Sequence, residues 1–141
     1  MRLKVVLDTN VLIDAIPEWS PRRIILDALI DDRYDAVLNN EIFKEYEEKL
    51  TERFDPEVAE WALDIFRILP NVFVQEVWFN FYLIENDPDD NKFSDCALAA
   101  NANYIVSNDK DFNVLISTAF PKIGLLKTAE FAAMLWSKEI P

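Results

Sequence analysis

The sequence contains no histidine, one glycine and one cysteine among its 141 residues. The lack of histidine excludes serine-histidine triads, cysteine-histidine dyads and histidine-containing zinc sites. A single glycine, Gly124, excludes the GxGxxG turn and the Walker A loop. The lone cysteine, Cys96, cannot form an internal disulfide, which agrees with a reducing cytoplasmic location. Any catalysis must therefore use other side chains.

Long hydrophobic runs are also missing. The chain reaches Asp8 after only three consecutive apolar positions, so we expect neither a signal peptide nor a membrane span. Hydrophobic residues nevertheless make up 51% of the chain, which is far too many for a disordered protein. The length is typical of one domain, so we expect residues 1–141 to form a single domain.

Acidic side chains are abundant in the sequence. The chain has 26 Asp and Glu against 14 Lys and Arg, which gives a formal net charge of -12. Carboxylates can act alone or can hold a hard cation such as Mg²⁺ or Mn²⁺. If the protein is an enzyme, we expect its acids to carry the chemistry.

Short apolar strands alternate with helical segments along the chain. This pattern predicts an α/β sandwich with a mainly parallel central sheet. We expect strands at 3–7, 36–38, 104–107 and 123–126, an extended segment at 72–83, and helices at 9–16, 21–30, 41–53, 55–70, 90–102 and from 128 onward.

Acids follow two of the predicted strands. Asp8 comes directly after the first strand, and Asp109 and Asp111 follow the strand at 104–107. In open α/β sheets the functional crevice lies beyond the carboxyl ends of the strands, so these acids are candidates for a shared site. Asp90 belongs to a third acidic cluster, at the start of a helix. The alternative for each is N-capping, with Asp111 capping a short helix that extends to Leu115.

Carboxylates gathered in one crevice repel each other, and a divalent cation reverses that balance. A cation held there can polarise a phosphoryl oxygen and activate water, without any histidine. The acids therefore favour a metal-dependent phosphoryl-transfer or hydrolysis site.

Three segments together resemble a PIN domain, the nuclease fold of VapC-like toxins in bacterial toxin-antitoxin pairs. They are VVLDTNVLI at 5–13, NNEIFKEYEEKL at 39–50 and DPDDNKFSDCALAANANYIVSNDKDF at 87–112. Their order and spacing match the family over nearly the whole chain. The resemblance implies a three-layer α/β/α sandwich with about five strands, and a single PIN-like nuclease domain at 1–141.

The resemblance also implies the site. Its catalytic and metal-binding quartet would be Asp8, Glu45, Asp90 and Asp109, holding Mg²⁺ or Mn²⁺ for the hydrolysis of an RNA phosphodiester. Asn10 and Ser107 would be supporting polar groups. Asp95 lies about 140° around its helix from Asp90, so we expect it in a supporting position or at the surface, and Asp111 as a ligand through water. Only the family motif selects Glu45 among the acids of its helix.

The net charge of -12 opposes general nucleic-acid affinity, which comes mainly from Lys and Arg. A local basic rim of Arg22, Arg23, Lys92 and Lys110 would reduce this objection, and ordinary solvated surface is the alternative for these residues. The charge also favours a basic protein partner, and the resemblance implies an antitoxin. The aromatic segment at 78–83 favours a homodimer or antitoxin docking.

Two other functions share part of this pattern. A phosphatase of the haloacid-dehalogenase type needs a second acid two residues after the first, and Asn10 occupies that position. A catalytically degenerate PIN domain that binds protein or RNA is the non-enzymatic alternative. The presence of all four acids favours the ribonuclease.

Overall fold

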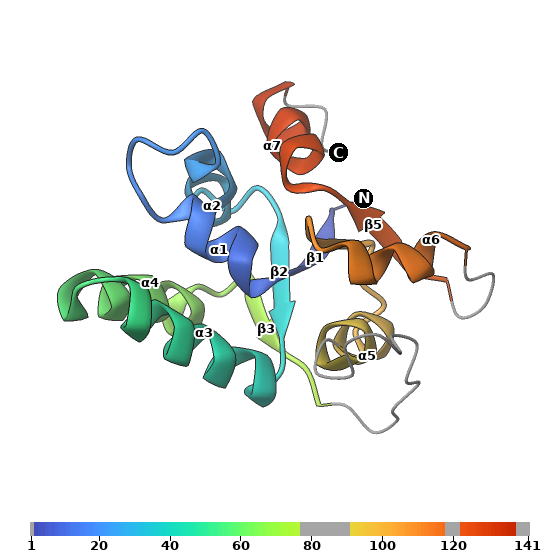
Figure 1. Cartoon of the computed structure of the whole chain (residues 1–141), viewed down its shortest axis with the longest axis horizontal. Coiled ribbons are helices and arrows are strands. Elements are labelled where there is room, and N and C mark those ends of the chain that lie inside the picture. The colour runs from blue at the N-terminus through green and yellow to red at the C-terminus, as the bar shows by residue number, and fades with distance from the viewer. Residues whose placement is uncertain (1, 77–90, 118–121, 138–141) are drawn as a thin grey trace.

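The computed structural model describes residues 2–76, 91–117 and 122–137 (Figure 1). Its centre is a five-stranded sheet with the order β3-β2-β1-β4-β5, in which all neighbouring strands are parallel. The strands are β1 (Lys4–Leu7), β2 (Asp35–Leu38), β3 (Val72–Val74), β4 (Tyr104–Val106) and β5 (Gly124–Leu126). The predicted α/β class and parallel sheet are confirmed.

Helices cover both faces of the sheet. In Figure 1, α1 (Thr9–Ala15), α2 (Arg23–Ile30), α3 (Asn40–Arg53) and α4 (Pro56–Ile68) lie on one side. On the other side lie α5 (Asn91–Ala99) and α6 (Val114–Ser117), the latter preceded by the 3-10 helix η2 (Lys110–Asn113). The last helix, α7 (Thr128–Ser137), packs against α2. No helix within the described ranges is long and apolar enough to cross a membrane.

Strand register brings three chain segments to one edge of the sheet. Leu7 of β1 pairs with Val106 of β4, and Val106 pairs with Leu126 of β5. The residues that follow these three strands therefore meet at their carboxyl ends. This is the edge at which open α/β sheets place their ligands.

The one glycine of the chain lies where β5 joins the sheet. A Cβ atom on Gly124 would lie 2.5 Å from the carbonyl oxygen of Asn103 and 2.7 Å from the ring of Tyr104. Its role is close approach of two strands, because no glycine in the described ranges has a positive φ. Gly124 thus allows β5 to lie close beside β4.

Several helix boundaries differ from the prediction by one to three residues, and two of these differences have a clear local cause. Helix α2 begins at Arg23 because the Ser20 hydroxyl accepts a hydrogen bond from the Arg22 N–H and donates one to the Asp14 carbonyl, which holds these residues in a turn. Helix α5 ends at Ala99 because Asn101 adopts a left-handed conformation with φ of 54°. The Ala102 N–H then bonds the Ala97 carbonyl at 2.8 Å, which closes the helix end.

The extended segment predicted at 72–83 is only partly described. It contributes β3, and the aromatic residues at 78–83, on which the prediction of a homodimer or antitoxin surface rests, lie outside the described residues.

Candidate functional site

Asp8 is buried between β1 and β4. It is 6% exposed, and its Oδ2 accepts a 2.7 Å hydrogen bond from the Ser107 hydroxyl. It occupies the N-cap position of α1, but its side chain forms no capping hydrogen bond, so capping does not explain it. Burial raises the pKa of the Asp8 carboxyl, and the charges of Glu45 and Asp109 raise it further, whereas the Ser107 hydrogen bond lowers it. Asp8 is thus a buried acid whose pKa is also raised by the charges of two neighbouring acids.

Asp109 belongs to the same hydrogen-bond network. Its N–H donates to the Ser107 hydroxyl at 3.0 Å, so Ser107 links the Asp8 side chain to the Asp109 backbone. The Asp109 Oδ1 accepts from the Asp111 N–H at 2.9 Å and caps η2. The alternative role of Asp111, capping this helix, is therefore wrong, because Asp109 is the residue just before its first turn. Asp111 itself is half-buried within that turn.

Glu45 is held by two side chains. The Thr9 hydroxyl donates to Oε2, and the Lys92 ammonium donates to Oε1 at 2.8 Å. The Lys92 and Glu45 side chains are 9% and 19% exposed, so this is a largely buried ion pair. Thr9 adjoins Asp8, which explains how α3 brings Glu45 near enough to affect the Asp8 pKa. Sequence reasoning did not identify Thr9 as part of the site.

The predicted basic rim is not formed by Lys92 or Arg23. Lys92 faces inward to Glu45. The Arg23 guanidinium pairs with Asp27, donates to the Ile16 carbonyl at 2.7 Å and lies over the Trp61 ring. Lys92 is therefore buried against an acid of the predicted site, and Arg23 is held by its own local partners, so neither forms an exposed basic rim.

Of the remaining predicted site residues, the structure describes Asp95 and Asn10. Asp95 is buried in α5, so the surface alternative for it is wrong. Asn10 is exposed at the start of α1 and lines the Asp8 pocket. Asp90 lies outside the described residues. Within the described ranges, no three acidic or cysteine side chains already converge as a metal-binding group.

A pocket of about 250 Å³ opens at Asp8. The residues that line it are Asp8, Asn10, Val11, Asp14, Asn108, Asp109 and Thr128. Sequence reasoning missed Asp14, Asn108 and Thr128. The signal for Thr128 was its position two residues after the strand predicted at 123–126, at the same sheet edge as Asp8.

The donor set at this edge fits a hard divalent cation. Its potential ligands are carboxylate oxygens, which Mg²⁺ and Mn²⁺ prefer. Burial is the main cause of the raised pKa of Asp8, the charges of Glu45 and Asp109 add to it, and a bound cation would oppose both effects by favouring the charged carboxylate. The Glu45 carboxylate is already paired with the Lys92 ammonium, so a bound metal ion would have to share this carboxylate with Lys92.

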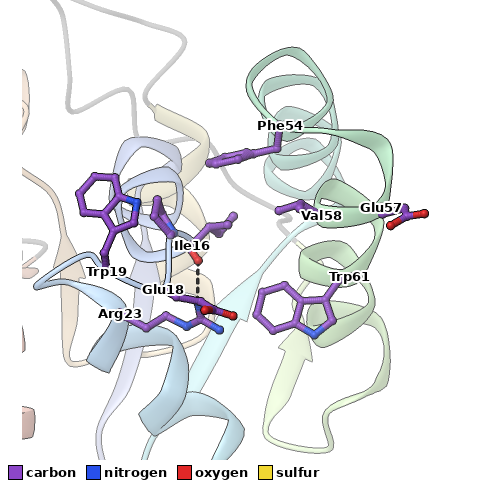
Figure 2. Close-up of a pocket in the computed structure, with 9 residues that line it drawn as sticks. Ile16, Glu18, Trp19, Arg23, Phe54, Glu57, Val58 and Trp61 are labelled. Atoms are coloured by element: carbon purple, nitrogen blue, oxygen red, sulfur yellow. Dashed lines mark hydrogen bonds between the residues drawn. The ribbon is translucent and has the colours of Figure 1, made fainter.

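A second, apolar pocket of about 640 Å³ lies between the α1–α2 connection and α4, away from Asp8 (Figure 2). Figure 2 shows Ile16 and Trp19 on one side of it and Val58 and Trp61 on the other. Trp19 is 84% exposed, which is unusual for so large an apolar side chain.

Comparison with known proteins identifies the fold. A family model described as PIN domain matches residues 4–111. A solved structure of VapBC2 from Rickettsia felis, bound to a DNA fragment of its promoter, is 18% identical and has a TM-score of 0.60. That match covers 89% of this chain and 98% of the other. The PIN domain of RRP44 from T. brucei is 15% identical with a TM-score of 0.52, over 98% of this chain and 84% of the other. No curated protein matches.

Proposed function

Because the chain belongs to the PIN domain family, we propose that it is a Mg²⁺- or Mn²⁺-dependent endoribonuclease and the toxin of a toxin-antitoxin pair. The family itself supports a nuclease-type function. The observation that carries the finer proposal is Asp8, a buried acid fixed by Ser107 and placed beside the charges of Glu45 and Asp109. The proposal takes residues 1–141 as one domain that acts in the cytoplasm.

In this proposal Asp8, Glu45, Asp90 and Asp109 hold the cation. When bound, the cation would polarise the phosphodiester and make water a better nucleophile. Ser107 orients the Asp8 carboxylate through its 2.7 Å hydrogen bond. Thr9 and Lys92 fix the Glu45 side chain. Asn10, Asp95 and Asp111 are proposed as supporting groups.

The antitoxin is proposed as a basic peptide segment with apolar side chains. The solved VapBC2 structure is a precedent for a protein partner, but the partner in that structure is that of VapBC2 itself. In this chain the apolar pocket of Figure 2 offers a surface for such a segment, with Glu18 and Glu57 among the residues that line it. The net charge of -12 complements a basic partner. The predicted homodimer stays a prediction.

The test is cleavage of single-stranded and structured RNAs by the wild-type protein with Mg²⁺, with Mn²⁺ and with EDTA. Asp8→Asn should abolish cleavage and leave the fold intact. Asp55→Asn is the matched control, because Asp55 is exposed and its side chain makes no capping bond to α4. Cleavage that persists in EDTA, or in the Asp8→Asn protein, would contradict the assignment.

A binding module is the second candidate function. Two observations favour it: no three acids converge within the described ranges, and Lys92 already neutralises Glu45. This candidate predicts RNA or protein binding without cleavage in either metal. Cleavage that requires Asp8 and metal would exclude it.

A further inference from the structure

One side chain in the Asp8 pocket carries a hydroxyl group that the contacts of the fold do not explain. Thr128 is 1% exposed, and its hydroxyl oxygen is buried without a hydrogen-bond partner among the described residues. A buried hydroxyl without a partner destabilises a protein, and valine would fill the same volume without that cost. The fold alone therefore does not explain threonine at this position.

The position of Thr128 suggests a ligand. It is the first residue of α7 and lines the same pocket as Asp8 and Asp109. Helix N-termini present N–H groups and a partial positive charge, which favour anions. At this terminus the Lys127 N–H donates to Glu130 Oε1 at 2.8 Å, and the Thr128 N–H donates to Asn108 Oδ1 at 3.0 Å. The buried hydroxyl lies at the positive end of a ten-residue helix.

Asn108 adds a second neutral donor. Because its Oδ1 accepts the Thr128 N–H, its side-chain amide must point its NH₂ group elsewhere. Asn108 is exposed and lines the pocket, so this NH₂ group is available to a ligand there. The Asn108–Thr128 bond also joins the end of β4 to the start of α7.

We propose that the Thr128 hydroxyl, with the Asn108 amide and the N-terminus of α7, binds a phosphate oxygen of the RNA backbone. This inference rests on the proposed ribonuclease function. It assigns these groups to the part of the pocket that binds the RNA substrate. None of the described residues that line the pocket is Lys or Arg. Neutral dipoles must therefore supply the attraction for a phosphate, while the acids opposite them are left for the cation.

The experiment measures RNA binding and stability on the same variants. A fluorescein-labelled ten-nucleotide single-stranded RNA is titrated in Mg²⁺ buffer with the Asp8→Asn protein, and binding is followed by fluorescence anisotropy. Thr128→Val and Thr128→Ser are added to this background. Thr51→Val is the matched control, because Thr51 is exposed on α3 and does not line the Asp8 pocket.

We expect Thr128→Val to weaken RNA binding roughly tenfold, which is the loss of one hydrogen bond to a charged group. The same variant should melt about 3 °C higher, because it removes an unpaired buried hydroxyl. Thr128→Ser should bind RNA within about twofold of its parent, because it keeps the hydroxyl. Thr51→Val should leave binding unchanged.

A merely structural role gives a different pattern. If Thr128→Val lowers the melting temperature, the hydroxyl stabilises the fold and the inference is overturned. Unchanged RNA binding by Thr128→Val also overturns it. The wild-type cleavage assay, run in parallel, separates the two proposals: Asp8-dependent cleavage with unchanged binding by Thr128→Val refutes only the phosphate site, whereas absence of cleavage refutes the ribonuclease.

Discussion

The Lys92–Glu45 pair allows a quantitative prediction about the metal site. Lys92→Met keeps the length of the side chain and removes its charge, so Glu45 is left as a largely buried carboxylate near Asp8 and Asp109. The N–O distance is 2.8 Å, and the side chains are 9% and 19% exposed. Solvent therefore screens this pair much less than a surface pair.

At 2.8 Å the Coulomb attraction is about 6 kcal/mol for an effective dielectric constant of about 20. Desolvation of the two groups offsets part of this gain. Removal of one partner from a buried pair typically costs about 3–5 kcal/mol, because the other charge stays buried and unpaired. Since Glu45 is not fully buried and also bonds Thr9, we expect about 3 kcal/mol for Lys92→Met.

Urea denaturation of four proteins tests this value: wild type, Lys92→Met, Glu45→Gln and the double variant. The double variant should be more stable than the sum of the single losses predicts, with a coupling energy of at least about 1.5 kcal/mol. A coupling energy below about 0.5 kcal/mol would refute the buried pair.

The same variants connect the pair to the metal. If a divalent cation binds Glu45, it must compete with Lys92 in the wild type. Mg²⁺ should then raise the melting temperature of Lys92→Met more than that of the wild type, and should not do so once Glu45 is also replaced. Equal shifts in Lys92→Met and the double variant would show that Glu45 is not a ligand.

Four further outcomes follow from individual contacts. Ser107→Ala should lower metal-dependent RNA cleavage about 10- to 100-fold with the circular dichroism spectrum retained, because Asp8 loses its orienting bond; an equal rate would contradict this. Gly124→Ala should lower the free energy of unfolding by about 1–3 kcal/mol, because its Cβ would overlap the Asn103 carbonyl; unchanged stability in urea would show that β5 shifts freely. Cys96 is buried with its pKa raised to about 12, so its thiol stays protonated below that pH and should react with Ellman's reagent only on unfolding; rapid labelling of the native protein would show an exposed thiol. Finally, log Kd for single-stranded RNA should rise with log salt concentration with a slope below about 2, since neutral groups line the phosphate side of the pocket; a slope of about 4 would reveal a basic surface.

The sequence was sufficient for the sheet edge because the relevant signals are local. Asp8 ends a short run of apolar residues, and Asn39 precedes a helix, where its side chain accepts the Ile42 N–H at 2.8 Å as a cap. The parallel sheet then follows from alternation of strands and helices. Helix ends were less accurate where a short-range contact overrides the periodic pattern, as at Ser20 and at the left-handed Asn101.

The site was less predictable because its contacts join distant positions. Nothing local to Thr9 or Lys92 indicates that both reach Glu45, which is 36 and 47 residues away along the chain. Lys92 is one of the four cations expected to form a basic rim, yet its ammonium is buried against the Glu45 carboxylate. Thr128 follows a predicted strand, but its position beside Asp8 depends on the pairing of β5 with β4. Helix packing decided the contacts of Thr9 and Lys92, and strand pairing decided the position of Thr128; no local pattern encodes either.

The acidic charge of the chain and the proposed RNA substrate are compatible if binding is confined to one pocket. Surface lysines would attract any nucleic acid and give a steep dependence on salt. A pocket that has no Lys or Arg among its described lining residues, and that offers the Asn108 amide and the Thr128 hydroxyl, would bind a phosphate through neutral donors. Such an arrangement binds weakly to RNA in general, and a divalent cation held by the acids would add to the attraction. The net charge of -12 also favours a basic protein partner. Such a partner would bind acidic side chains, so it would not need the groups that are proposed to bind RNA.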